Sequence, residues 1–461
     1  MPQTSDVRMT SAARPGPQHH GLRGWGFRLL VLASVLSFAG YVLLLPVVPL
    51  WAARGGAGEL GAGATTAVFM GTTVLTQLAM PWLLDHGGYR WTFPVGALLL
   101  GAPAPLLGLT TDLGLLLAVS GLRGVGFGMV TVVGSALAAR LVPPDQIGRA
   151  AGYYGMAVGL PHVAFLSGGV WAALNLGFDA VFWAAGAAPV AGALAAAGIW
   201  LMAGSGAMAS GESPGQKGAA EAAGQSGVAG AAGPTGSAGS PGSAGPAEPP
   251  SPAGPAGPAA AAPAARGPRA HARLAAPLLL MLVCALSSSA VVTFLAIPLE
   301  EAATVVFAAL LAYGLLSVAG RWAAGALSDR RRRIAVLVPA TAMTAVGMGL
   351  AAAALWPAGP GWEGPGALGA AAAVAGAALF GAGFGAVQND TLVVMFRRSG
   401  PRGYGTASAV WNIGYDGGAG LGAVIVGLAV QAAGYGPAFA LAATAVALCL
   451  PVAAILVRRP D

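Results

Sequence analysis

The sequence is poor in charged residues, in lysine, in cysteine and in histidine. Only 8% of its 461 residues are charged, against roughly a quarter in an ordinary soluble domain, and this scarcity excludes a soluble globular enzyme. The two cysteines, Cys284 and Cys449, lie inside apolar segments, and the five histidines are scattered. We therefore expect no disulfide framework, no metal or nucleophile cluster and no cofactor. A Gly-Lys-Ser/Thr loop is also missing, so ATP hydrolysis is not expected.

Long apolar runs fill most of the chain instead. Hydrophobic residues make up 56% of it, and a bilayer-spanning helix takes roughly 20 such residues. Backbone groups in lipid must bond to one another, and no alternating strand pattern is present, so the spans are predicted to be helices. The predicted spans are 29–51, 64–84, 92–110, 114–138, 151–173, 181–202, 274–297, 304–327, 334–356, 367–395, 405–430 and 437–457. The expected fold class is an all-α membrane protein with twelve transmembrane helices.

The positions of the basic residues predict the orientation, because Lys and Arg in short loops resist translocation. With a cytoplasmic N-terminus, all basic residues except Arg54, Arg123 and Arg321 fall on the cytoplasmic side. We therefore expect a multi-pass protein of the cell membrane with both termini in the cytoplasm. The net charge of +7 then reflects topology, and a nucleic acid is not expected as a partner.

One long stretch, 204–273, consists mainly of Ala, Gly, Pro and Ser. It cannot bury enough apolar surface to fold alone, so we expect a disordered cytoplasmic linker. The alternative to a passive linker is a docking or regulatory segment. The expected organisation is an N-terminal tail, a six-helix bundle, the linker, a second six-helix bundle and a C-terminal tail, at 1–28, 29–203, 204–273, 274–457 and 458–461.

The two predicted bundles repeat each other. Gln77, Pro81 and Asp85 correspond at one constant offset to Arg321, Gly325 and Asp329. A second correspondence joins the Gly-Val-Gly-Phe-Gly run at 124–128 to the Gly-Ala-Gly-Phe-Gly run at 381–385. Glycines four residues apart also allow close helix packing, which alone would explain these runs. The repeat predicts two pseudo-symmetric halves.

The segments after the second and eighth spans carry a recognisable motif of the form Gly-x-x-x-Asp-Arg-x-Gly-Arg-Arg. The second copy retains Gly325, Asp329, Arg330 and Arg333, and the first retains Asp85, Gly88 and Arg90. Arg332, Pro81, His86 and Tyr89 depart from the motif. With twelve spans in two repeats, the sequence resembles the major facilitator superfamily of secondary transporters.

That resemblance implies a cytoplasmic gate in which aspartates pair with arginines in one of two states. The residues expected in the gate are Asp85, Arg90, Arg321, Gly325, Asp329, Arg330, Arg333 and Asp390. The alternative for Asp85 and Asp329 is an ordinary loop that only sets the topology. Asp390 could instead line the cytoplasmic half of the cavity.

The stretch from Pro143 to Gly155 resembles the drug:proton antiporter branch of the same superfamily. Two features depart from that branch: Arg123 directly precedes Gly124, and Leu160 interrupts the expected Gly-Pro pair of the fifth span. The resemblance implies proton-coupled efflux of a small amphipathic organic compound or drug. The alternatives are a symporter that imports a metabolite and, more remotely, a membrane sensor that transports nothing.

Three ionisable residues fall near the middle of predicted spans, namely Arg123, His162 and Asp416. Each such group costs free energy in lipid and is a functional candidate. We expect Asp416 to alternate between protonated and ionised forms, His162 to relay protons and Arg123 to bias both by its charge. Asn412 should share the helix face of Asp416. The alternative is that the three are structural and do not titrate.

The expected substrate wall is otherwise apolar and aromatic. It comprises Tyr41, Ser288, Thr293, Asn389 and Trp411. Such a lining suits an amphipathic organic molecule better than a sugar or a phosphate, although each residue could instead pack or face lipid. The expected partners are this small-molecule substrate, protons and the lipid bilayer, and we expect a monomer.

Overall fold

The computed structural model describes residues 21–143, 146–202, 268–331, 336–356, 364–399 and 404–458. The predicted linker lies outside these residues as far as position 267. Every regular element in the described part of the chain is helical. Helix ends fall near the predicted span ends because apolar length determines both.

The N-terminal half contains the helices that precede the linker. They are α1 (Trp25–Leu44), α2 (Val47–Arg54), α3 (Gly58–Gly101), the short η2 (Ala104–Leu109), α4 (Leu113–Arg140), α5 (Ile147–Leu176) and α6 (Phe178–Met202). Helices α1 and α2 together form one span, broken at Leu45 and Pro46, because proline lacks the amide hydrogen that a continuous helix needs.

The C-terminal half follows the linker. It contains α8 (Pro268–Ser289), η4 (Ala290–Phe294), α9 (Ala303–Arg331), α10 (Leu337–Leu355), α11 (Ala367–Ser399), α12 (Tyr404–Ala433), α13 (Tyr435–Ala447) and α14 (Leu450–Arg458). Element η4 is a π-helical turn, a local widening that occurs often at functional sites. Helices α13 and α14 together form one span.

Helix α3 contains two spans joined at Gly88. The backbone of Gly88 has φ 64° and ψ 169°, a left-handed conformation that glycine adopts without steric cost. Eleven helical segments of the described chain are long and apolar enough to cross a membrane. The part of α3 before Gly88, 58–87, is a further helical segment. The predicted all-α fold with twelve membrane helices is confirmed.

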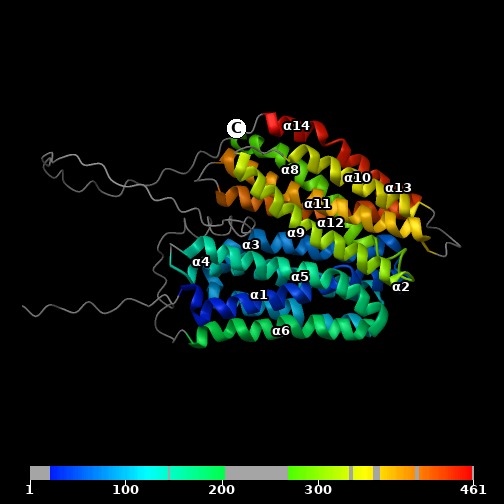
Figure 1. The fold of residues 1–461 in the computed structure, drawn as a ribbon. Helices are drawn as coiled ribbons and strands as arrows, with labels where there is room; N and C mark the ends of the chain where they lie inside the picture. Colours follow the sequence, from blue (N-terminus) through cyan, green and yellow to red (C-terminus); the bar gives the residue numbers. More distant parts are fainter. Residues whose placement is uncertain are drawn as a thin grey trace, which may run out of the picture.

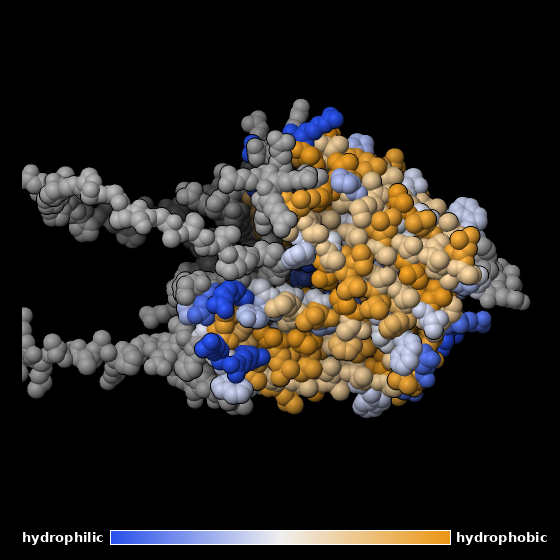
Figure 2. All heavy atoms as spheres, in the orientation of Figure 1, coloured by the Kyte–Doolittle hydropathy of each residue, from blue (hydrophilic) through white to orange (hydrophobic). Residues whose placement is uncertain are grey.

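The two halves lie side by side along their lengths, with α1 to α6 in one bundle and α8 to α14 in the other (Figure 1). Helix α3 packs against α12, and α5 packs against α9, so each contact joins one half to the other. On the face drawn in Figure 2, the surface of both bundles is mostly hydrophobic, with hydrophilic residues toward the two ends. Such a surface suits contact with lipid chains.

Glycines hold the helices of each half close together. A Cβ atom on Gly128 would lie 2.8 Å from the carbonyl oxygen of Thr73, and one on Gly124 would meet the carbonyl oxygen of Phe69. In the other half, Gly381 and Gly385 approach the backbone of α9 in the same way. The two glycine runs therefore have the packing role that their spacing allows.

Candidate functional site

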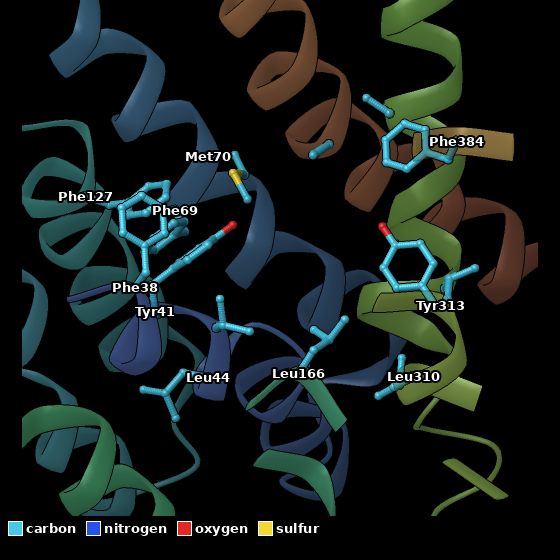
Figure 3. Close-up of a cluster of buried hydrophobic side chains, with 14 of the residues drawn as sticks. Phe38, Tyr41, Leu44, Phe69, Met70, Phe127, Leu166, Leu310, Tyr313 and Phe384 are labelled. Atoms are coloured by element: carbon cyan, nitrogen blue, oxygen red, sulfur yellow. The ribbon is translucent and has the colours of Figure 1, made fainter. Parts of the chain in front are cut away.

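Each half carries a cluster of aromatic side chains near the middle of the molecule. In the N-terminal half, Tyr41 stacks on Phe127 and on Phe69, with ring centroids 4.0 and 5.4 Å apart. In the C-terminal half, a second series runs through the rings of Tyr313, Phe380, Phe384, Tyr415 and Trp411. Figure 3 shows the hydroxyl groups of Tyr41 and Tyr313 directed toward the region between the halves.

The internal repeat relates these two clusters. The offset that pairs Gln77 with Arg321 also pairs Phe69 of α3 with Tyr313 of α9. The offset of the glycine runs pairs Phe127 of α4 with Phe384 of α11. The aromatic walls thus occupy equivalent positions in the two bundles, which places the centre of the site between the halves.

Asp416 of α12 lies at this centre, where α12 packs against α3 of the opposite half. Its side chain is 7% exposed, and its Oδ2 accepts a hydrogen bond of 3.0 Å from the Nε2 of Gln77. The same Gln77 amide lies 3.5 Å from the hydroxyl oxygen of Thr131. Among the described residues, no basic side chain lies within ion-pair distance of the Asp416 carboxylate. A neutral amide from the opposite half is therefore its polar partner.

Arg321 of α9 forms the equivalent contact within the C-terminal half. Its Nη2 donates a 2.6 Å hydrogen bond to Oε1 of Gln388, and Gln388 is the repeat equivalent of Thr131. The guanidinium also lies 5.8 Å from the ring centroid of Trp411. Its Nε is buried and has no acceptor among the described residues. At this position of the repeat, the N-terminal half has an amide, Gln77, and the C-terminal half has a cation, Arg321.

Arg123 of α4 is bound to backbone rather than to Asp416. Its side chain is 3% exposed, and it donates hydrogen bonds to the carbonyl oxygens of Leu100 and Gly40, at 3.1 and 3.4 Å. It borders a cavity of about 20 Å³ that Tyr41 and Phe69 also line. That volume holds about one water molecule, so the cavity is too small for an organic substrate in this conformation.

His162 of α5 is half-buried beside Tyr41. Its Nδ1 lies 3.1 Å from the carbonyl oxygen of Val158, one turn earlier on its own helix, and its ring centroid lies 5.9 Å from that of Tyr41. Its backbone packs against α9, where a Cβ atom on Gly314 would lie 3.2 Å from the carbonyl oxygen of His162. His162 therefore contacts the helix that carries Arg321, while Asp416 is bound to Gln77.

The other residues expected in the cavity take several positions. Asp390 is fully buried and accepts a 3.2 Å hydrogen bond from Asn389. Ser288 donates to the carbonyl of Ala285 on its own helix. Trp411 is buried, with its indole nitrogen donating to Thr391 at 3.1 Å. Asn412 is exposed and donates back to Ser408, so it does not share the burial of Asp416.

The expected cytoplasmic gate is described only in part. Arg90 is exposed, with its guanidinium 5.2 Å from the ring centroid of Trp91. Gly325 of α9 faces Asn389, whose Oδ1 would lie 3.5 Å from a Cβ atom at that glycine. The side chains of Asp85, Asp329 and Arg330, and the whole of Arg333, lie outside the described residues.

The two halves are in contact at the end of the molecule where α2 ends and α9 begins, which we call the distal end. Arg54 and Glu300 form an ion pair there at 2.9 Å. The hydroxyl of Tyr435 donates to Glu59 at 3.4 Å. Deeper in, the hydroxyl oxygens of Thr66 and Thr293 lie 3.4 Å apart, so Thr293 of η4 contacts the opposite half. The distal end is therefore closed.

Sequence reasoning found the ionisable residues of the centre but did not find Gln77, Thr131 and Gln388 as their partners. The repeat contained the signal for two of them, because its offsets relate Thr131 to Gln388 as they relate Gln77 to Arg321. Polar residues at equivalent positions of two halves, beside an ionisable residue, are candidates for its partners.

Comparison with known proteins decides the family. The family model described as Major Facilitator Superfamily matches residues 30–415. The chain belongs to the major facilitator superfamily. It is accordingly a secondary transporter and a multi-pass membrane protein, and it is not an enzyme.

A solved structure supports the same fold. The crystal structure of the nucleoside transporter NupG aligns with a TM-score of 0.61 and 10% identity, covering 94% of this chain and 99% of that one. At this identity the likeness concerns the fold alone. A comparison with curated protein sequences finds no match.

Proposed function

We propose that this major facilitator protein moves a small amphipathic organic compound across the cell membrane in a proton-coupled cycle of alternating access, with Asp416 as the proton-binding group. The observation that supports this most is the burial of the Asp416 carboxyl between the two halves, where the Gln77 amide is its hydrogen-bond partner. The walls beside it are aromatic, which favours an amphipathic substrate over a sugar.

The position of Asp416 couples a proton to a movement of the halves. A carboxylate in a low-dielectric interior is costly when no cation compensates it, and Gln77 supplies only a neutral dipole. Binding of a proton removes this cost while α3 and α12 are in contact. Release of the proton favours a state in which the carboxylate reaches water, and that state requires the halves to separate.

The closed distal end is one of the two end states in this proposal. We place it at the outer face, because the positive-inside pattern places both chain termini and the 204–273 linker in the cytoplasm. The pairs Arg54 with Glu300 and Glu59 with Tyr435 would then separate when the transporter opens outward. The gate residues around Asp85 and Asp329 would close the cytoplasmic side in that second state. We propose a monomer with a passive linker.

Two directions of coupling are compatible with this cycle. The resemblance of 143–155 to the drug:proton antiporter branch supports efflux in exchange for protons. Cotransport of the compound with a proton is the second candidate. One observation favours cotransport: Arg321 is a cation within the membrane that has no ion-pair partner among the described residues. A negatively charged substrate would bind to Arg321 best when Asp416 is protonated and therefore neutral.

Purified protein in liposomes with an imposed pH gradient tests the proposal. A panel of neutral, anionic and cationic aromatic compounds should include one that the gradient drives against its own concentration difference. Asp416→Asn should bind that compound but lose the dependence on the gradient, because an amide cannot take up the proton. Asp179→Asn, an exposed aspartate at the start of α6, is the matched control. If Asp416→Asn transports with an unchanged pH dependence, the proposal is wrong.

A further inference from the structure

The two arginines within the membrane differ in how their charge is satisfied. Arg123 donates to two backbone carbonyl oxygens and borders a cavity of about 20 Å³, so it is bound and enclosed. Among the described residues, Arg321 donates only to the neutral side chain of Gln388, and its buried Nε has no acceptor there. Arg321 is therefore the cation that retains hydrogen-bonding capacity for a ligand.

An aromatic face lies directly beside this guanidinium. The Trp411 ring lies 5.8 Å from the Arg321 carbon Cζ, and the Tyr415 ring is stacked on Trp411 with centroids 5.7 Å apart. Phe384 continues the series, 6.1 Å from Tyr415 and almost parallel to it. A planar ring placed along this series can stack while a group at its edge reaches the guanidinium.

The positive charge of Arg321 is what distinguishes it from its repeat equivalent, Gln77. Gln77, the equivalent of Arg321, has a neutral amide that is already bound to Asp416. Replacing Arg321 with glutamine would thus give the C-terminal half the residue that the N-terminal half has at the equivalent position. Such a change removes the positive charge and keeps a polar donor of similar reach.

We infer that Arg321, Trp411 and Tyr415 form the binding site for the negatively charged group of a planar organic anion, such as an aromatic carboxylate. The carboxylate accepts hydrogen bonds from the guanidinium, which presents planar donors suited to that group. The ring of the ligand stacks along Trp411 and Tyr415. A lipophilic cation would be repelled by Arg321 at the same place. This inference rests on the proposed function in that it names the charge and shape of the transported compound.

A binding measurement on the purified full-length protein tests the charge preference without any gradient. The probes are 1-naphthoate, the neutral 1-naphthamide and the cationic 1-naphthylmethylammonium, titrated by calorimetry. Charge-assisted hydrogen bonds in a desolvated site predict that the carboxylate binds roughly tenfold or more tightly than the amide, and that the ammonium binds most weakly. Equal affinities for the carboxylate and the amide would overturn the inference.

A pair of variants assigns the preference to Arg321. Arg321→Gln should lose the tenfold advantage of the carboxylate. Arg28→Gln is the matched control, because Arg28 also lies over a tryptophan ring, 5.6 Å from that of Trp25, but is exposed near the start of α1. Retention of the full preference in Arg321→Gln would contradict the assignment. If Arg321→Gln does not fold, the three probes on the unaltered protein still decide the charge preference.

The two proposals fail in different ways. Absence of a carboxylate preference removes the inference about the ligand and leaves proton coupling to be judged by transport. Tight binding of 1-naphthoate by a protein whose transport does not respond to a pH gradient would support the anion site and contradict the proposed coupling.

Discussion

The Nε2 of Gln77 in the N-terminal half donates a 3.0 Å hydrogen bond to the buried carboxylate of Asp416 in the C-terminal half. The two residues are 339 positions apart in the chain, so this bond exists only while α3 and α12 are packed together. Because it joins the expected proton site to the opposite half, its formation depends on the conformational state of the transporter.

Loss of this bond should shift the balance of conformations. In Gln77→Leu the Asp416 carboxyl loses its partner, and removal of a hydrogen bond to a buried carboxyl costs about 1–3 kcal/mol. We expect the distal-closed state to become roughly tenfold less favoured. Spin labels on cysteines introduced at Leu109 and Leu368, which are 75% and 86% exposed at the distal ends of the two halves, report this state as a distance distribution.

Thr72→Val is the control for that experiment. Thr72 also lies on α3, but its hydroxyl donates to carbonyl oxygens of its own helix, so the distances should stay as in the unaltered protein. An equal shift in both variants would show that the change in Gln77→Leu comes from α3 itself and not from the contact with Asp416.

Close backbone contact should matter more to the distal closure than the surface ion pair. A Cβ atom on Gly63 would meet the carbonyl oxygen of Ala423 in the opposite half, and overpacking of this kind costs about 1–3 kcal/mol. Glu300→Gln removes only an exposed ion pair, worth about 0–1 kcal/mol. We expect Gly63→Ala to lengthen the label distances more than Glu300→Gln does.

Gly71→Ala on the same helix serves as the reference, because nothing lies within 4 Å of a Cβ atom there. It should leave the distance distribution unchanged. A smaller effect of Gly63→Ala than of Glu300→Gln would mean that charge, rather than packing, holds the distal end closed.

The turn at Gly88 should be sensitive to substitution for a conformational reason. Its φ of 64° is left-handed, and nothing surrounds it within 4 Å of a Cβ atom. Gly88→Ala should therefore lower stability by about 1–3 kcal/mol through backbone strain alone, measured as a lower thermal unfolding temperature in detergent. Gly349→Ala, in open space within α10, should leave that temperature unchanged or raise it slightly. Equal unfolding temperatures for Gly88→Ala and Gly349→Ala would contradict the expected backbone strain at Gly88.

The sequence predicted the helices well and the partners poorly, for physical reasons. Span positions follow from apolar length, which is local, and Gly88 could be recognised from its motif. The partners of Arg321 and Asp416 depend on how helices from different parts of the chain pack. Gln388 and Asp390 are both polar residues of α11, and the packing of α11 against α9 determines that Gln388 is the one bonded to the Arg321 guanidinium, at 2.6 Å.

The same limit applies to the residues near Asp416. Asn412 is one helical turn away and was expected on the same face, but it is exposed and bonded to Ser408. Arg123 was expected to act on Asp416 and instead binds carbonyl groups of Leu100 and Gly40. The spacing of residues in the sequence shows which of them share a face of one helix. Burial and hydrogen-bond partners depend on the other helices packed against that face, which the spacing does not show.

The groups near Asp416 determine which variants have to be compared when the pH dependence of transport is measured. Gln77 bonds to it from α3, Tyr415 precedes it on α12, and His162 lies on α5 beside Tyr41. Arg321 lies on α9, which packs against α5. His162 is the other group in this set that could carry a proton near neutral pH. His162→Gln therefore has to be compared with Asp416→Asn.

The most direct test is the proton movement that accompanies substrate transport, recorded with a pH-sensitive dye inside liposomes that contain the protein. Addition of the transported compound should move protons in the unaltered protein and, at a reduced rate, in His162→Gln, because a relay can be bypassed by water. Asp416→Asn should still move the compound down its gradient and should move no protons with it. Substrate-dependent proton movement of normal size in Asp416→Asn would contradict the account.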